Sequence, residues 1–367
     1  MISVTAMTPL EDLRAWMAAH NVDAAYVTKP VSIAYLTGFH AEPYERLMAL
    51  TVRPDRATLI VPALEHEKAA GHAAGRVEIV SWRDGEDAYE LARGALEGCA
   101  EVGVEKEHLS LQAAEILRAR TSVRALIDVG PELRRLRRIK NPTELEKLAR
   151  AASITDTVGE EIIDLLRAGQ TELEVSVVIG AAIGAHGGTL SFESLVQSGP
   201  NSALPHVRPT SRKLGEGDFV LLDFGAAFDG YKADTTRMAV VGAPGEQHAE
   251  IYRLVVEAHD AAIAAVRAGT TTGAVDAAAR QVIEAAGMGD RFFHRTGHGL
   301  GLEAHEDPSL DPGSATVLEA GMVFTIEPGI YIPGWGGVRI EDDVVVERSG
   351  CRLLTQADRS LRVISER

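Results

Sequence analysis

Hydrophobic and polar residues alternate with two different spacings in the first part of this chain. Four short apolar runs, each bounded by polar or turn-forming residues, predict strands: residues 23–27, 33–39, 56–61 and 77–80. Helical spacing predicts helices before and between them: residues 8–20, 63–74 and 87–97. Strands that alternate with helices of this length are typical of an α/β unit with a mostly parallel sheet.

The second part of the chain combines long helices with strands joined by tight turns. Helical spacing predicts helices at residues 142–168, 246–268 and 272–286, and a capping-box pattern opens a further helix at Thr171. Apolar runs predict four strands: residues 219–224, 232–240, 322–331 and 338–347. Helices and antiparallel hairpins segregated in this way indicate an α+β domain.

A basic run separates the two parts. Residues 132–140 read ELRRLRRIK and are followed by Asn141 and Pro142, a proline that suits the first turn of a new helix. A nucleic-acid surface is one interpretation of such a run, but the whole chain carries a formal net charge of −16. A solvated helix end that connects two domains is therefore favoured. We expect domains at residues 1–135 and 136–367.

Composition narrows the class of protein. A chain of 367 residues, 46% hydrophobic and 25% charged, is long enough for two domains with substantial cores. Its acidity argues against nucleic acid or an anionic membrane as a partner. The two cysteines, Cys99 and Cys351, lie far apart and indicate a reducing compartment. We see no signal-peptide pattern and no apolar run near the roughly 20 residues that span a bilayer, so we expect a cytoplasmic protein.

The stretch 219–237, FVLLDFGAAFDGYKADTTR, contains two aspartates in a predicted hairpin. Asp-Gly at positions 229–230 favours a two-residue turn, which would pair position 223 with position 236. Asp223 and Asp234 would then be diagonal neighbours on one face of the pair. Carboxylates this close resist ionisation. Either they are solvated aspartates on an exposed face, or they form part of a site for a divalent metal ion.

Three further segments place polar residues in apolar or glycine-rich surroundings. Residues 294–308, HRTGHGLGLEAHEDP, hold three histidines in a glycine-rich loop. Glu327 ends an apolar run immediately before Pro-Gly, where an unpaired carboxylate would be costly. Arg339 and Glu341 would share one face of a strand, where a cross-strand ion pair is the alternative interpretation.

Together these segments supply four carboxylates and one imidazole: Asp223, Asp234, His298, Glu327 and Glu341. Oxygen-rich coordination with one nitrogen suits Mn²⁺ and also accommodates Co²⁺ or Zn²⁺. Four negative charges are too many for one divalent ion but balance two. Two metal ions can share a bridging hydroxide and hold the carbonyl oxygen under attack, which is the chemistry of metal-assisted hydrolysis.

Four motifs, LLDFGAAFDGYKADTTR, HRTGHGLGLEAHEDP, FTIEPGIYI and GVRIEDD, occur in an order and spacing that resemble metallopeptidase family M24. This pita-bread group holds methionine aminopeptidases, prolidases, aminopeptidase P and creatinase. The resemblance covers the chain from about residue 137 onward, and IAYLTGF in the first part resembles the creatinase/prolidase N-terminal domain. It implies an α+β pita-bread catalytic domain behind an N-terminal α/β domain.

The resemblance also implies roles for individual residues. Asp223, Asp234, His298, Glu327 and Glu341 would be the ligands of a dinuclear site, with Asp234 and Glu341 bridging. Glu327 would be the general base that moves a proton from the bridging water to the leaving nitrogen. The other implied roles are substrate contact near the scissile bond for His206, hydrogen bonding to the substrate or tetrahedral intermediate for His305, lining of the proline pocket for His294, and support of the metal site for Arg339.

The same resemblance narrows the substrate. Creatinase keeps the fold without the metals, whereas all five ligands are present here. Methionine aminopeptidases usually lack a separate N-terminal domain and the Val-Arg-Ile-Glu-Asp arrangement. The proline-specific branch remains, so we expect a homodimeric prolidase that cleaves Xaa-Pro dipeptides by attack of a metal-bridging hydroxide. Aminopeptidase P, which acts on longer Xaa-Pro peptides, stays open as the alternative, as do another metal hydrolase and a non-catalytic binding relative.

Overall fold

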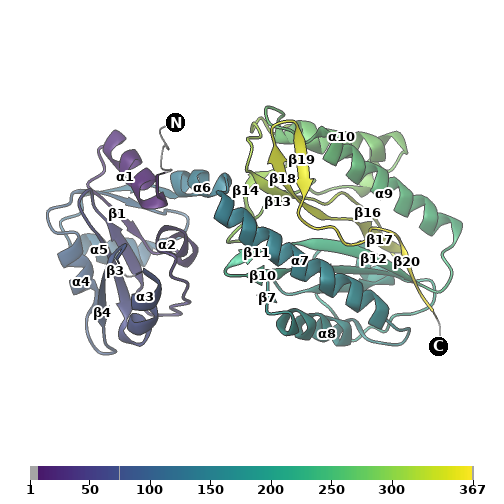
Figure 1. Cartoon of the computed structure of the whole chain (residues 1–367), viewed down its shortest axis with the longest axis horizontal. Helices are drawn as coiled ribbons and strands as arrows, with labels where there is room; N and C mark the ends of the chain where they lie inside the picture. Colours follow the sequence, from purple (N-terminus) through teal and green to yellow (C-terminus); the bar gives the residue numbers. More distant parts are fainter. Residues whose placement is uncertain (1–6, 74, 366–367) are drawn as a thin grey trace. The chain divides into compact units, whose positions relative to one another are not determined.

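The computed structural model describes residues 7–73 and 75–365 and divides the chain into two compact units, Met1–Arg137 and Arg138–Arg367 (Figure 1). The expected two-domain architecture is therefore confirmed. Within the described residues, no helix combines the length and the apolar composition that a bilayer crossing requires.

The first unit is built on a six-stranded sheet. In spatial order its strands are β4 (Glu78–Trp82), β3 (Ala57–Pro62), β2 (Ala49–Val52), β1 (Ala24–Val27), β5 (Glu101–Val104) and β6 (Ala125–Asp128). Its helices are α1 (Pro9–Ala19), α2 (Pro30–Thr37), α3 (His66–Ala73), α4 (Ala88–Ala95), α5 (Leu111–Arg120) and α6 (Gly130–Arg138), which continues into the second unit. Three of the five strand pairings are parallel, and only β2 opposes its neighbours. The mostly parallel sheet is confirmed.

One predicted strand is wrong. Residues 33–39 do not form a strand, because helix α2 runs through Pro30–Thr37 and ends at Gly38, whose φ of 80° stops the helix. Ile33, Ala34 and Leu36 are all buried, so the helix is apolar on several sides and shows no helical spacing. A short apolar run of this kind cannot be assigned to strand or helix from periodicity alone.

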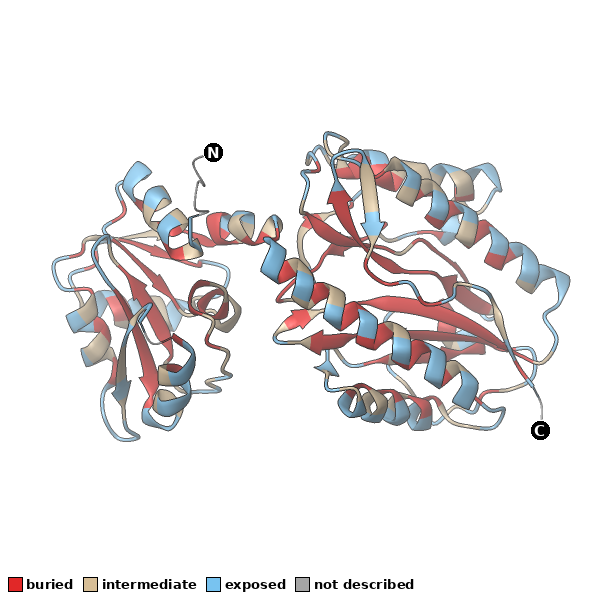
Figure 2. Cartoon of the chain, viewed as in Figure 1, coloured by how far each residue is buried: buried red, intermediate tan, exposed pale blue. Residues whose placement is uncertain are grey.

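The second unit packs two pairs of helices outside its sheets. Helices α7 (Pro142–Leu165) and α8 (Glu172–Ala185) share one core with β8 and β9, and helices α9 (Glu246–Ala265) and α10 (Thr272–Ala285) share another with β15 and β18. Figure 2 shows most of the strands buried and the outer faces of these helices exposed. This is the expected α+β arrangement.

Four small sheets fill the interior of the second unit. The first has the order β20-β12-β9-β8 and the second β14-β13-β15-β18-β19, beside a three-stranded β11-β10-β7 and the hairpin β16-β17. The bounds are β7 Thr189–Leu190, β8 Leu195–Ser198, β9 Phe219–Phe224, β10 Ala226–Phe228, β11 Tyr231–Lys232, β12 Thr235–Val241, β13 His298–Gly299, β14 Glu306–Ser309, β15 Val323–Ile326, β16 Gly329–Ile332, β17 Gly336–Arg339, β18 Asp342–Glu347, β19 Gly350–Leu353 and β20 Arg362–Ile364.

The predicted hairpin register is confirmed. Phe228 pairs with Tyr231, and Asp223 pairs with Thr236, as a two-residue turn requires. The turn residues Asp229 and Gly230 have φ angles of 49° and 84°, the positive values of a type I′ turn.

Three of the predicted strands are each divided. The run 232–240 breaks at Ala233 and Asp234, between β11 and β12. The other two breaks lie later in the chain. The run 322–331 breaks after Ile326, between β15 and β16, and the run 338–347 breaks after Arg339, between β17 and β18. In both of these later runs one half pairs in the five-stranded sheet and the other in the β16-β17 hairpin. These two breaks are neighbours, because Ile326 pairs with Asp342 and Gly329 pairs with Arg339. Glu327 and Glu341 therefore lie where the chain passes from one sheet to the other.

Candidate metal centre

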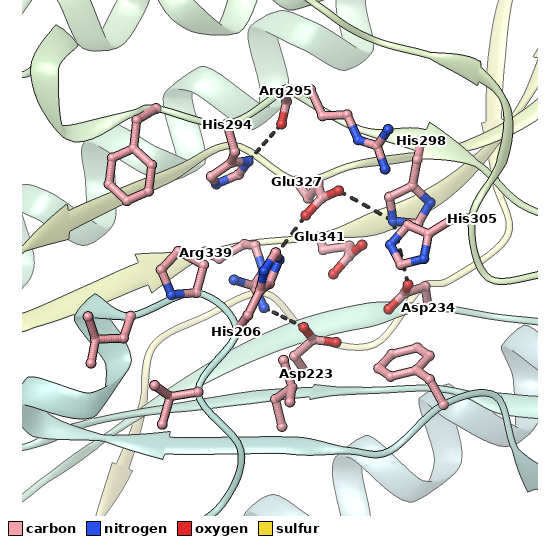
Figure 3. Close-up of a pocket in the computed structure, with 16 residues that line it drawn as sticks. His206, Asp223, Asp234, His294, Arg295, His298, His305, Glu327, Arg339 and Glu341 are labelled. Atoms are coloured by element: carbon pink, nitrogen blue, oxygen red, sulfur yellow. Dashed lines mark hydrogen bonds and ion pairs between the residues drawn. The ribbon is translucent and has the colours of Figure 1, made fainter.

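A cavity of about 770 Å³ in the second unit brings together all of the candidate ligand, catalytic and substrate-binding residues expected from the sequence (Figure 3). Its polar lining consists of His206, Asp223, Asp234, His294, Arg295, His298, His305, Glu327, Arg339 and Glu341. Apolar side chains form the rest of its wall: Phe192, Leu195, Leu204, Pro205, Val207 and Phe293.

The five candidate ligands come from four places in the fold. Asp223 lies near the end of β9, and Asp234 lies just before β12 on the other arm of the hairpin. His298 begins β13, while Glu327 and Glu341 occupy the two neighbouring strand breaks. Figure 3 shows their side chains converging on one space. Residues about a hundred positions apart thus meet because the sheets turn at these points.

The four carboxyl groups resist ionisation. Burial is the largest cause and raises the pKa of Asp223, Asp234 and Glu341, and it raises the pKa of Glu327 to about 7. Mutual repulsion adds to burial, since the charge of Glu341 further raises the pKa of Asp234. Such a cluster is stable as carboxylates only beside cations.

The remaining atoms of the cluster fit a divalent cation. Asp223 Oδ1 and Asp234 Oδ1 are buried without a hydrogen-bond partner among the described residues. Burial lowers the pKa of His298 to about 3, so its imidazole is neutral, and its Nε2 lies 3.8 Å from Asp234 Oδ2 and 3.4 Å from Glu327 Oε1. Asp234, His298 and Glu341 each offer a ligand atom within 4.8 Å of the others. Neutral imidazole and unpaired carboxylate oxygens are the usual donors of metal sites.

Arg339 contacts carboxyl groups of the cluster directly. Its guanidinium donates to Asp223 Oδ2, to Thr236 Oγ1 at 3.0 Å and to the Tyr331 hydroxyl at 3.1 Å. Thr236 Oγ1 donates in turn to Glu341 Oε2 at 2.6 Å. The single positive charge of Arg339 cannot balance four carboxylates. The cluster would therefore be stabilised by bound cations.

The three histidines outside the donor set surround the cluster. The His305 ring lies beside the His298 ring, with centroids 4.1 Å apart and planes tilted by 49°. Burial lowers the pKa of His294 to about 4, and its Nε2 lies 2.9 Å from the Tyr331 hydroxyl. His206 lies on a loop whose carbonyl groups at Leu204, Pro205 and Val207 accept hydrogen bonds from Gln197 Nε2 at 2.8–3.3 Å.

Sequence reasoning missed two residues of this site. Arg295 is half-buried in the cavity wall, and its Nη1 donates to Ser309 Oγ at 3.0 Å. Tyr331 is fully buried and its hydroxyl joins His294 to Arg339. Arg295 stands inside the histidine motif, a signal that could have found it. Tyr331 looks like any aromatic residue of an apolar strand and carries no such signal.

The raised pKa values predict how the metal-free protein responds to pH. Above about pH 7.5 histidines are neutral in both states, so the carboxyl groups decide the sign. The unfolded chain has lost their protons by then, whereas the folded protein still retains part of them at groups such as Glu327, whose pKa is about 7. The free energy of unfolding should therefore fall between pH 7.5 and 8.5, by up to about 1.4 kcal/mol per pH unit for each retained proton.

Urea unfolding of chelator-treated protein at several pH values would measure this slope. A Glu327→Gln variant is the matched comparison, because it removes one such proton and should flatten the curve. A free energy of unfolding that rises with pH over this window would contradict the assignment.

A buried carboxylate and imidazole cluster in a cavity of an α+β domain defines a metal-dependent enzyme. Family models support this class: residues 146–348 match the metallopeptidase family M24, and residues 9–139 match the creatinase/prolidase N-terminal domain. The chain belongs to metallopeptidase family M24. The expected pita-bread domain behind an N-terminal α/β domain is thereby confirmed.

Individual relatives match over nearly the whole chain. An Xaa-Pro dipeptidase of Lactobacillus helveticus is 38% identical, over 97% of this chain and 98% of its own length. The solved structure of an Xaa-Pro dipeptidase from Bacillus anthracis is similar with a TM-score of 0.91 at 35% identity, covering 97% of this chain and 99% of that one. An X-Pro aminopeptidase from Thermotoga maritima matches with a TM-score of 0.87 at 30% identity, covering 94% and 98%.

Proposed function

We propose that this protein is a prolidase, a metal-dependent exopeptidase that hydrolyses the Xaa-Pro bond of dipeptides. The observation that carries the proposal is the meeting, in one cavity, of a metal donor set with the half-buried cation Arg295. The similarity to relatives described as Xaa-Pro dipeptidases supports the same substrate.

In this proposal the donor set holds two divalent ions, with Mn²⁺ the preferred metal and Co²⁺ or Zn²⁺ as alternatives. The ligands would be Asp223, Asp234, His298, Glu327 and Glu341, with Asp234 and Glu341 serving both ions. When bound, the ions supply a water of lowered pKa and positive charge beside the carbonyl oxygen under attack. Glu327 takes a proton from the attacking water at a carboxylate oxygen and passes it to the leaving nitrogen.

The other residues bind and orient the dipeptide. A proline nitrogen in peptide linkage has no N–H to donate, so recognition must use the ring and the neighbouring carbonyl. We assign His294 to the proline pocket, beside the apolar wall of the cavity. His206 contacts the substrate near the scissile bond, and His305 donates to the substrate or the tetrahedral intermediate. Arg339 supports Asp223 and the network around it.

Arg295 distinguishes dipeptides from longer peptides in this proposal. A dipeptide presents its free carboxylate directly after the proline ring, and a guanidinium binds a carboxylate through paired, charge-assisted hydrogen bonds. Such a bond contributes about 1.5–3 kcal/mol, so Arg295→Gln should raise KM for an Xaa-Pro dipeptide by roughly 10- to 100-fold.

Steady-state kinetics of wild type and variant on the dipeptide and on its C-terminal amide would test this assignment. The amide lacks the carboxylate and serves as the control, so its KM should hardly change. Equal losses on the two substrates would refute the role of Arg295.

The function itself is tested by comparing an Xaa-Pro dipeptide with an Xaa-Pro-Yaa tripeptide on Mn²⁺-loaded protein. We expect efficient cleavage of the dipeptide alone. Strong cleavage of the tripeptide would instead support aminopeptidase P, the alternative favoured by the similarity to the Thermotoga maritima enzyme. Turnover of another ester or amide without peptide cleavage would indicate a different metal hydrolase, and metal binding without turnover would indicate a binding relative.

The proposal also covers the domain roles, the cellular location and the partners of the protein. We assign catalysis to residues 136–367 and a separate N-terminal domain to residues 1–135. We also propose that the protein is a cytoplasmic homodimer and that it binds a small peptide with proline in the second position. In this proposal it binds neither nucleic acid nor a membrane. The net charge of −16 supports the exclusion of anionic partners.

A further inference from the structure

A buried charged cluster lies behind the candidate ligands, outside the cavity. At its centre is Arg237 on β12, three positions beyond Asp234 and only 2% exposed. It is not among the residues that line the cavity. Burying a guanidinium costs free energy unless the group is paired and hydrogen-bonded. The partners of Arg237 therefore indicate its structural role.

Arg237 connects three separate segments through four hydrogen bonds. Its Nη1 donates to the carbonyl oxygens of Glu341 at 2.7 Å and of Thr236 at 3.0 Å. Its Nη2 donates to Asp342 Oδ1 at 2.6 Å and to the carbonyl oxygen of Ala357 at 2.9 Å. One side chain therefore joins the strand that follows Asp234 to the backbone of Glu341.

Further hydrogen bonds cross between the same segments, including one from the backbone N–H of Glu341 to the carbonyl oxygen of Thr236 at 3.3 Å. Thr235 Oγ1 donates to the carbonyl oxygen of Glu341 at 3.1 Å, and Asp343 Oδ2 accepts from the backbone N–H of Asp234 at 3.0 Å. The backbone of each candidate bridging ligand is thus held by residues adjacent to the other ligand. The distance between Asp234 and Glu341 is set by these contacts, because their own side chains repel one another.

The cluster balances its charge internally. Asp342 Oδ1 also accepts from Thr355 Oγ1 at 2.9 Å, and Asp342 Oδ2 lies 3.2 Å from Nε2 of the buried His259. The Arg237 guanidinium and the Asp342 carboxylate thus form a buried ion pair outside the cavity, at 2.6 Å.

We propose that Arg237 is a positioning residue that fixes Asp234 and Glu341 at the separation two divalent ions require, and so sets the affinity for metal. The inference rests on the metal site of the proposed function. Without this contact the two repelling carboxylates would separate in the metal-free protein, and binding would have to bring them back. Outer contacts of metal ligands typically change metal affinity by 10- to 100-fold.

Titration of stripped protein with Mn²⁺ alone tests this proposal, with the dissociation constant as the readout. Arg237→Met should raise that constant by about 10- to 100-fold, and Arg237→Lys should raise it less, because the charge beside Asp342 remains. Activity of both variants should recover toward the wild-type value as Mn²⁺ is increased, since Arg237 does not reach the cavity.

Arg212→Met is the control, because the half-buried Arg212 pairs with Asp218 at 2.5 Å and this pair contacts neither Asp234 nor Glu341. It should destabilise the fold without changing the affinity for Mn²⁺. Thr355→Val serves if Arg237 variants do not fold, since it removes one hydrogen bond from Asp342 and should weaken Mn²⁺ binding measurably.

Wild-type affinity in a folded Arg237 variant, or in Thr355→Val if no Arg237 variant folds, would overturn the inference while leaving the proposed function intact. A wild-type protein that binds no Mn²⁺ would overturn both.

Discussion

Glu327→Gln should lower kcat on an Xaa-Pro dipeptide by about 10²- to 10⁴-fold, the usual contribution of a general base. The amide keeps the shape of the side chain but cannot accept the proton of the attacking water. It also removes one charged donor from the metal site. Burial holds the pKa of Glu327 at about 7 in the metal-free site, within reach of a proton-transfer role near neutral pH.

The loss must be separated from unfolding and from loss of metal. Thermal unfolding should show a folded variant, because a neutral amide is less costly to bury than a carboxylate. Bound metal should be measured beside kcat, so that a catalytic loss at full occupancy can be recognised. Glu284→Gln, on the exposed face of α10, is the control and should leave kcat unchanged. A Glu327→Gln enzyme with near wild-type kcat would exclude Glu327 as the base.

Removal of divalent metal ions should abolish peptide hydrolysis, and Mn²⁺ should restore it. The reason lies in the cavity itself: four carboxyl groups with raised pKa values share one arginine, and two of their oxygens have no hydrogen-bond partner among the described residues. A bound cation removes the repulsion, so the metal should also stabilise the fold, by about 2.7 kcal/mol at a concentration one hundred times its Kd.

Two measurements on the same samples check this expectation. Metal content by elemental analysis and hydrolysis of the dipeptide should fall and recover together, and the melting temperature should rise with added Mn²⁺. Addition of Mg²⁺ serves as the comparison, since a site with an imidazole donor suits it poorly. Full activity in protein shown to be free of metal would rule out the metal-dependent mechanism.

Local signals explain what could be predicted from the sequence. The hairpin register follows from Asp229-Gly230 alone, because few residue pairs adopt the positive φ angles of its turn, and the register places Asp223 opposite Thr236. The charge and spacing of the motifs are sufficient to select the five candidate ligands from the sequence. Helix α2 has the pattern of a strand because it is apolar on several sides.

Other features depend on tertiary structure and leave little trace in the sequence. Pro328 and Gly329 follow Glu327, and charged residues surround Glu341, so both positions look irregular in the sequence. These signals do not show that the chain passes from one sheet to another at each position. Arg237 belongs to the same motif as Asp234, but the sequence does not show whether an arginine is buried or exposed. Tyr331 acquires its role only through the two partners that its hydroxyl meets.

The hydrogen bonds that hold the loop around His206 affect how a small substrate binds. Gln197 holds three carbonyl groups of that loop from beneath, so the wall over the catalytic space is already in place before a substrate arrives. A dipeptide has few atoms and hence little contact free energy with which to order a mobile segment. Because the loop is ordered beforehand, that contact free energy remains available to align the peptide bond, and product release requires no unfolding of the wall.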